Sequence, residues 1–110
     1  MIETEMGGNQ TVWIYSSLRG DRDFAEILPF FVDELPQKQA LLKELVSSKD
    51  MENLRREAHK LRGSAGGYGF QELSDLAGNL EESCQNIPSN EAAILRNLND
   101  LLDHLQRVRT

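Results

Sequence analysis

Apolar residues recur at helical spacing through most of the chain. In the first long run they follow one another at intervals of three, four and seven residues, at Phe24, Leu28, Phe31, Leu35, Leu42 and Leu45. These intervals place the apolar side chains on one face of an α-helix that starts near Asp21 and stops within residues 47–50. Pro36 lies inside the run but leaves its phase unchanged, which predicts one kinked helix. Pro29 indicates that the regular part of this helix begins later than Phe24.

Three further amphipathic helices are predicted. The second begins near the capping residue Asp50 and carries its apolar face at Leu54, Ala58, Leu61 and Ala65. The third follows Gly69, with apolar residues at Phe70, Leu73, Leu76, Ala77, Leu80 and Cys84. The last follows a turn in the stretch NIPSN, residues 86–90, and has apolar residues at Ile94, Leu98, Leu101, Leu105 and Val108. Four such helices with short connections predict an all-α, antiparallel up-and-down four-helix bundle.

The chain before the first helix is less regular. Residues 1–10 are polar and contain glycine, so we expect a flexible tail there and a single helical domain over residues 11–110. The stretch TVWIYSSL, residues 11–18, fits either a short strand or an anchoring helix by composition. We expect its Trp13 and Tyr15 to pack against the bundle.

Composition narrows the class of protein. A length of 110 residues allows one domain with a modest core, and a net charge of −6 argues against nucleic-acid binding. No apolar run approaches the roughly 18 residues that span a membrane, and the first ten residues lack the features of a signal peptide. The single cysteine, Cys84, excludes an internal disulfide and a multi-cysteine zinc site. We therefore expect a cytoplasmic protein that binds neither nucleic acid nor membrane.

His59 lies on the second predicted helix, and its position on the helix directs it outward. At 100° per residue, the apolar face of this helix is centred roughly 130° from His59. Four basic residues and one acidic residue, Glu57, occupy residues 55–62, a local charge of +3 in a chain of −6; the basic ones are Arg55, Arg56, Lys60 and Arg62. This contrast predicts a surface that attracts an anionic partner.

Gly63 lies one turn after His59, on the same face of the helix. Glycine costs about 1 kcal/mol relative to alanine inside a helix, so its use there requires a reason. A missing side chain beside the imidazole leaves space that a reacting partner needs. Gly63 is therefore predicted to give a partner access to His59.

The chemistry open to His59 can be narrowed by elimination. Metal binding needs several convergent ligands, and the other histidine, His104, lies far along the last helix, where we read it as a C-terminal cation without a special role. Ser64 lies close to His59 in the sequence but faces another side of the helix, which disfavours a hydrolytic triad. A nucleophilic histidine with basic residues that steady a phosphoryl group remains.

These residues carry a family resemblance. Residues 58–81 resemble the signature of histidine-containing phosphotransfer (HPt) domains. This stretch reads AHKLRGSAGGYGFQELSDLAGNLE and ends with Glu81. The likeness extends upstream through the helix that contains Pro36. It implies a four-helix bundle, in which a short extra N-terminal helix is often present, and an exposed histidine that accepts a phosphoryl group from a receiver-domain aspartate and passes it to another receiver.

The resemblance also implies roles for individual residues. His59 matches the phospho-accepting position, Glu81 the residue that orients the imidazole, and Lys60 and Arg62 the basic positions near the phosphoryl group. The expected receiver-contacting residues are Arg55, Arg56, Gly63, Ser64 and Gly66. Gly69 matches the glycine of the turn between the two hairpin helices. No cofactor is expected on this chain, because the receiver would supply Mg²⁺, and no ATP site resembling that of a kinase is visible, so we expect a monomeric phosphocarrier and not an enzyme.

Two alternatives stay open. The first is the dimerisation and phosphoacceptor domain of a sensor kinase, in which an acidic residue and a proline usually follow the histidine. Here Lys60 follows it and no proline occurs between His59 and Pro88, which disfavours this reading. The second is a helical adaptor that binds receivers without carrying phosphate, and the sequence alone does not exclude it.

Overall fold

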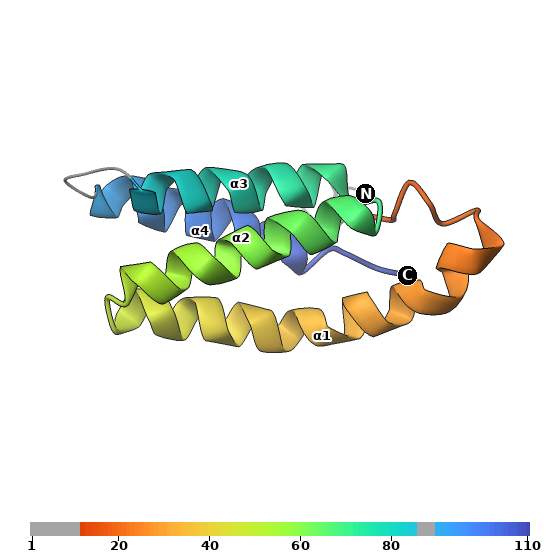
Figure 1. Cartoon of the computed structure of the whole chain (residues 1–110), viewed down its shortest axis with the longest axis horizontal. Helices are drawn as coiled ribbons and strands as arrows, with labels where there is room; N and C mark the ends of the chain where they lie inside the picture. The colour runs from red at the N-terminus through yellow and green to blue at the C-terminus, as the bar shows by residue number, and fades with distance from the viewer. Residues whose placement is uncertain (1–11, 86–89) are drawn as a thin grey trace, which may run out of the picture.

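The described part of the chain folds into four antiparallel helices. The computed structural model describes residues 12–85 and 90–110, with helices α1 (Arg22–Ser47), α2 (Met51–Gly67), α3 (Gln71–Gln85) and α4 (Glu91–Leu105). Figure 1 shows α2 between α1 and α3, with α4 behind them. The predicted all-α, up-and-down four-helix bundle is confirmed. The predicted tail at residues 1–10 and most of the predicted turn at residues 86–90 lie outside the described residues.

Side-chain caps set the starts of three helices. Asp21 Oδ1 accepts a hydrogen bond from the backbone N–H of Asp23 at 2.9 Å, and Asp50 Oδ1 accepts one from the N–H of Asn53 at 3.2 Å. Asn90 Oδ1 accepts one from the N–H of Ala93 at 3.1 Å. Each cap satisfies a donor that the first helical turn leaves without a partner. The predicted start at Asp50 is confirmed.

Helix α1 contains both of its prolines. It runs unbroken through Pro29 and Pro36, so the expectation that its regular part begins later than Phe24 is wrong. A proline removes one helical hydrogen bond, but burial of Leu28 and Phe31 on either side of Pro29 compensates for that loss. Figure 1 shows α1 bending in its N-terminal turns, beyond the end of α2. One helix therefore continues across Pro36, as predicted.

The core is built from the apolar faces that the sequence pattern predicts. Buried residues come from all four helices, and α2 packs most closely on α3. Phe31 stacks on Tyr68 and Phe70, with ring centroids 4.8 and 5.7 Å away, which ties α1 to the turn between α2 and α3. Val108 is buried but lies after the end of α4, so the prediction that the last helix includes it is wrong.

The N-terminal segment closes one end of the bundle in an extended form. Ile14 pairs with Val108 in a single parallel bridge, in which Ile14 N–H donates to Arg107 O and Arg109 N–H donates to Ile14 O, both at 2.8 Å. Residues 12–21 form no helix, so the extra N-terminal helix that the resemblance allows is absent from them. The stretch is extended because its alternation turns Ile14 and Ser16 inward.

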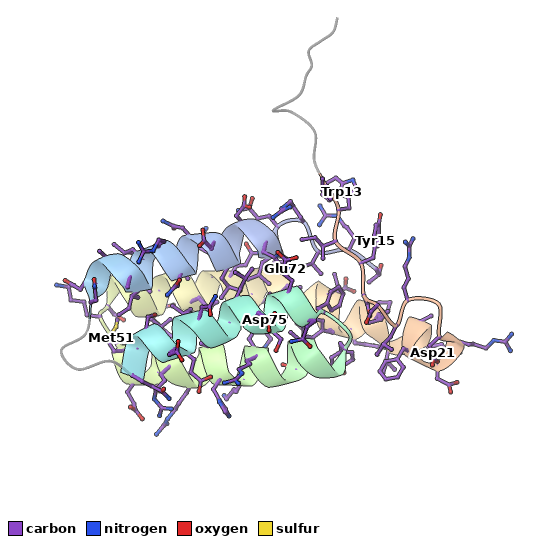
Figure 2. All side chains as sticks on the ribbon, turned by 90° about the horizontal axis from the view of Figure 1, so that it is seen from above. Trp13, Tyr15, Asp21, Met51, Glu72 and Asp75 are labelled. Carbon is purple, nitrogen blue, oxygen red and sulfur yellow. The ribbon has the colours of Figure 1, made fainter. Side chains whose placement is uncertain are left out.

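The aromatic residues of this segment do not pack into the core. Trp13 and Tyr15 project from it at the end of the bundle where α3 begins (Figure 2). Both are exposed, and each lies against an arginine: Arg109 over the Trp13 ring at 4.0 Å and Arg19 over the Tyr15 ring at 3.9 Å. The expectation that they pack against the bundle is wrong, because the alternation that turns Ile14 and Ser16 inward turns these two side chains outward.

The turn between α2 and α3 requires Gly69. Its φ of +84° lies in the region that favours glycine, and a Cβ there would clash with Ser16 Oγ and Leu18. The N-terminal segment holds this turn, since Ser17 N–H donates to Gly69 O at 2.9 Å and Ser16 Oγ donates to Tyr68 O at 2.6 Å. The predicted role of Gly69 in the hairpin turn is confirmed, and this turn sets how α3 lies against α2.

Candidate functional site

His59 and Glu81 form a pair across α2 and α3. The His59 side chain is 67% exposed and the Glu81 side chain only 8%, and His59 Nδ1 lies 2.8 Å from Glu81 Oε2. His59 faces outward because the neighbouring positions Ala58 and Leu61 form the buried face of α2. The predicted outward orientation of His59 is confirmed. Glu81 follows Leu80 on α3 and lies at the boundary between the core and the imidazole.

Glu81 remains ionised although it is buried. Burial raises the pKa of its carboxyl group, but hydrogen bonds from His59 and Arg62 outweigh burial, so the net pKa lies below the ordinary value. Arg62 Nη1 donates to Glu81 Oε1 at 3.3 Å, so each carboxylate oxygen has its own donor. An ionised carboxylate can only accept hydrogen bonds, which places the His59 proton on Nδ1. The lone pair of Nε2 then lies on the exposed side of the ring.

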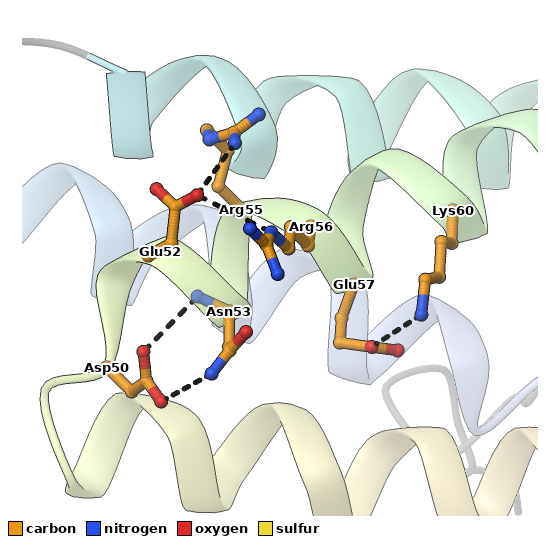
Figure 3. A network of polar contacts seen from close by, with 7 residues as sticks. All are labelled: Asp50, Glu52, Asn53, Arg55, Arg56, Glu57 and Lys60. Atoms are coloured by element: carbon orange, nitrogen blue, oxygen red, sulfur yellow. Dashed lines mark hydrogen bonds and ion pairs between the residues drawn. The ribbon is translucent and has the colours of Figure 1, made fainter.

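The remaining basic residues of α2 also have acidic partners. Figure 3 shows Arg55 and Arg56 both directed to Glu52, with N–O distances of 3.2 and 3.4 Å. It also shows Lys60 directed to Glu57, with Nζ 3.1 Å from Oε2. Lys60 therefore extends toward the side of α2 away from His59. Each pair has at least one exposed side chain, so solvent screens the attraction and each pair contributes little to stability.

The local charge is smaller than a count along the chain indicates. The four basic residues at positions 55–62 meet three carboxylates, at Glu52, Glu57 and Glu81, which leaves +1 in place of the +3 counted within residues 55–62. Glu52 lies just outside that stretch, and Glu81 comes from another helix. The positive character of the site is thus weaker than the sequence predicts.

The small residues after His59 have different surroundings. A Cβ at Gly63 would meet nothing within 4 Å, so the space beside the imidazole is open. A Cβ at Gly66 would lie 3.4 Å from Ser74 Oγ, which places Gly66 where α2 passes close to α3. Ser64 Oγ donates to Lys60 O of its own helix at 2.6 Å. Gly63 is therefore the one of the three whose missing side chain clears space next to His59.

His104 is the polar residue that the sequence pattern misplaces. It is 1% exposed, and neither ring nitrogen has a hydrogen-bond partner among the described residues. Burial lowers its pKa, which keeps the imidazole neutral, so its interpretation as a C-terminal cation is wrong. The signal was present, because His104 lies three residues after the buried Leu101 and shares its helix face.

Sequence reasoning also missed two residues of α3. Ser74 Oγ donates to the backbone carbonyl of Arg62 at 2.8 Å, and Gly78 lies beneath the Arg62 side chain. Gly78 follows Ser74 by four residues and Glu81 follows Gly78 by three, which places all three on one face of α3. Among residues 12–85 and 90–110, no three His, Cys, Asp or Glu side chains gather as metal ligands do, and no helix there is long and apolar enough to cross a membrane.

Comparison with known proteins gives one match. The family model described as the Hpt domain matches residues 26–110, which include all of α2, α3 and α4 and most of α1. Neither the comparison with curated proteins nor that with solved structures gave a match.

Proposed function

This chain belongs to the Hpt domain family, whose members carry phosphoryl groups on histidine in phosphorelays, and we propose that His59 is its phosphoryl-accepting residue. His59 accepts the group from a receiver-domain aspartate and passes it to another receiver. One observation carries the proposal: the exposed His59 ring has Nδ1 bound to a buried, ionised carboxylate. This arrangement supports Nε2 as the nucleophile, because Nδ1 is occupied and Nε2 carries the lone pair.

The transfer balances without a cofactor on this chain. His59 Nε2 attacks phosphorus, the N–P bond forms, and the P–O bond to the receiver aspartate breaks, which releases the aspartate carboxylate. The His59 ring keeps its Nδ1 proton and gains positive charge, and the Glu81 carboxylate 2.8 Å away stabilises that charge. The reverse sequence delivers the group to the next receiver. Mg²⁺ acts on the receiver side, so this chain is a phosphocarrier and not an enzyme with its own ATP site.

Arg62 and Lys60 contribute electrostatics in different ways. A guanidinium has five N–H donors, so the bond from Arg62 to Glu81 leaves donors for a phosphoryl oxygen. Lys60 is exposed and held only by an i,i+3 pair with Glu57, which is worth a few tenths of a kcal/mol. Its ammonium can therefore turn toward a phosphoryl group at a small energetic cost.

The surface around His59 is the proposed contact with the receiver. Gly63 leaves open space beside the ring. One turn earlier on α2, the half-buried Arg55 and the exposed Arg56 supply cations. Ser64 and Gly66 complete the surface toward the end of α2. Nothing in the described chain packs where a Gly63 side chain would lie, so the cost of glycine in this helix is explained by a partner.

A labelling experiment tests the proposal. A phosphorylated receiver is incubated with the full chain, which should gain an acid-labile, base-stable phosphate. His59→Gln should lose the label, and His104→Leu, which removes the only other histidine, should keep it. Far-UV circular dichroism checks that both variants fold. Full labelling of His59→Gln would show that the assignment is wrong.

The same experiment separates the alternative functions. An adaptor that carries no phosphate would bind the receiver, with unchanged affinity in His59→Gln, and would never be labelled. A kinase dimerisation domain would give an obligate dimer by native mass spectrometry. We expect a monomer, because the buried apolar residues of α1 to α4 already pack against one another in one core.

A further inference from the structure

The extended N-terminal segment has one backbone edge that the bundle does not use. Ile14 spends its N–H and C=O on the bridge to the chain around Val108. In an extended segment, the N–H and C=O groups of the residues on either side point to the opposite edge. These groups belong to Trp13 and Tyr15, and no backbone group among the described residues bonds to them. The edge therefore presents two donors and two acceptors that another extended chain could use.

The side chains along this open edge are aromatic and cationic. Trp13 and Tyr15 lie on the outward side of the segment, and both are exposed. The guanidinium of Arg109 lies over the Trp13 ring, and that of Arg19 lies over the Tyr15 ring. Each guanidinium carries five N–H donors, so contact with a ring leaves donors for a carboxylate.

The two arginines over the rings are available to an acidic partner. In the part of the chain that the structure describes, neither Arg19 nor Arg109 forms an ion pair, whereas Arg107 is paired with Asp103 at 3.2 Å. Arg109 Nη1 donates to two preceding backbone carbonyl groups at 2.9 and 2.7 Å, which fixes the side chain and leaves Nη2 and Nε. Because the whole chain has a net charge of −6, these two cations form a local surface of the opposite sign.

This surface is separate from the one around His59. Figure 2 shows Trp13 beyond the end of α4, with α2 on the opposite side of the bundle. The bridge between Ile14 and Val108 holds the segment there, because Val108 closely follows the end of α4. A partner bound to this edge would therefore leave His59 open to a receiver.

We propose that the open edge of residues 13–15 binds an extended, acidic segment of a partner protein. Such a segment adds a strand, and its backbone pairs with Trp13 and Tyr15, which supplies affinity for many sequences. Alternate residues of a strand share one face and lie about 7 Å apart, the same spacing as Trp13 and Tyr15. Acidic residues at alternate positions then meet Arg109 and Arg19, which supplies the specificity. His59 has no part in this binding, so it stands apart from the proposed function.

Tryptophan fluorescence of the full chain tests this binding, because Trp13 is the only tryptophan. The probe is a blocked peptide in which glutamate and valine alternate. It should change the Trp13 fluorescence in a saturable way, and the peptide with lysine in place of glutamate should bind at least about tenfold more weakly. Two N-methylated peptides, one on the glutamate amides and one on the valine amides, should differ in affinity by about tenfold, because only every second amide faces the edge.

Arginine variants locate the site. Arg19→Gln and Arg109→Gln should each weaken binding of the acidic peptide by about three- to tenfold, the loss expected with one exposed charge-assisted hydrogen bond. Arg96→Gln, which removes one positive charge from α4, is the matched control and should leave binding unchanged. His59→Gln should also bind the peptide with unchanged affinity. Far-UV circular dichroism checks that each variant folds.

The outcomes decide between a strand partner, charge alone and a membrane. No saturable change with the acidic peptide, or equal binding of the acidic and basic peptides, would overturn the proposal. Equal binding of the two N-methylated peptides would show that no strand pairs with the edge and would also overturn it. A Trp13 response to vesicles of phosphatidylserine and phosphatidylcholine, without one to the peptide, would overturn it in favour of a membrane contact. Binding as expected in a chain that receivers never label supports this proposal and contradicts the proposed function.

Discussion

The two histidines of this chain lie in opposite environments. His59 is exposed, and its Nδ1 is bound to Glu81, whereas His104 is buried and neither of its nitrogens has a hydrogen-bond partner in the part of the chain that the structure describes. Each has a glutamate of α3 nearby, but Glu81 lies 2.8 Å from its histidine and is buried, while Glu72 lies 3.9 Å from His104 and is exposed. The distance and burial of the carboxylate therefore distinguish an imidazole prepared for chemistry from one that serves as a core residue.

The largest expected effect comes from closing the open space beside His59. Gly63→Leu should slow phosphoryl transfer from a receiver by at least about 100-fold, because a clash at the interface costs several kcal/mol. A small phosphoryl donor such as phosphoramidate should still label the variant at a similar rate, since it needs little room. Gly63→Ala and Ala92→Leu, which adds bulk on an exposed position of α4, are the matched controls. Equal slowing with both donors would show that the residue acts on the histidine and not on docking.

A smaller effect on transfer is expected when His59 loses its glutamate, and no effect when His104 does. Glu81→Leu should slow transfer by about 10- to 100-fold, because outer hydrogen-bond partners orient a reacting imidazole. Glu72→Leu should leave transfer unchanged, because Glu72 does not approach His59. The measurement is the initial rate of labelling from a phosphorylated receiver, with thermal unfolding as the check on folding. Equal rates for Glu81→Leu and the unmodified chain would remove the distinction between the two histidines.

Part of the difference between the surroundings of His59 and His104 can be predicted from the sequence. The spacing of Leu54, Ala58 and Leu61 is sufficient to turn His59 outward, because helix geometry is local. The same reasoning could have placed His104 on the face of Leu101, but its polar character led to the wrong interpretation. The partner of His59 could be expected only from the family resemblance, because residues 59 and 81 are joined by the packing of two helices.

Other contacts depend on tertiary structure in ways that no local pattern reveals. The Arg62 path over Gly78 requires α2 and α3 to be in register, and that register depends on the turn at Gly69. The pairing of Ile14 with Val108 joins segments from opposite ends of the described chain. The ion pairs of Arg55 and Arg56 with Glu52 are local, and a wider window along the helix would have found them.

Stability against pH gives the next largest effect. Burial lowers the pKa of His104 in the folded chain. The contribution of the neutral ring to the free energy of unfolding is therefore fully present above the pKa of the unfolded chain, about 6.5, and is lost as pH falls through the folded pKa. The groups near it are Glu72, Asp103 and Arg107. His104→Leu should raise the free energy of unfolding by about 1 kcal/mol at neutral pH, because it removes a buried polar group without partners.

The pH dependence of this variant isolates the histidine. Between pH 7 and 5 the unmodified chain should lose up to about 1.4 kcal/mol per pH unit more than His104→Leu. Glu81 also has a lowered pKa, but its contribution is lost only as pH falls below the ordinary range of a glutamate, near pH 4.5. Urea unfolding at several pH values measures the free energy of unfolding of the unmodified chain and of His104→Leu. Parallel pH profiles for the two proteins would show that His104 does not titrate on unfolding.

The smallest expected effect concerns the positive charges that lie beside His59 on α2. Arg55→Gln with Arg56→Gln should lower the association rate with a phosphorylated receiver by a few fold, because exposed cations steer an anionic partner. Both arginines share Glu52, so Glu52→Gln should act in the opposite direction and raise the association rate. Both changes should shrink at high salt, since screening shortens the reach of exposed charges to about 3 Å at 1 M. Stopped-flow measurements at two salt concentrations test this, and Arg96→Gln on α4 is compared with Arg56→Gln alone, because each removes one positive charge. An equal response of these two single variants would mean that net charge, and not the surface beside His59, guides the receiver.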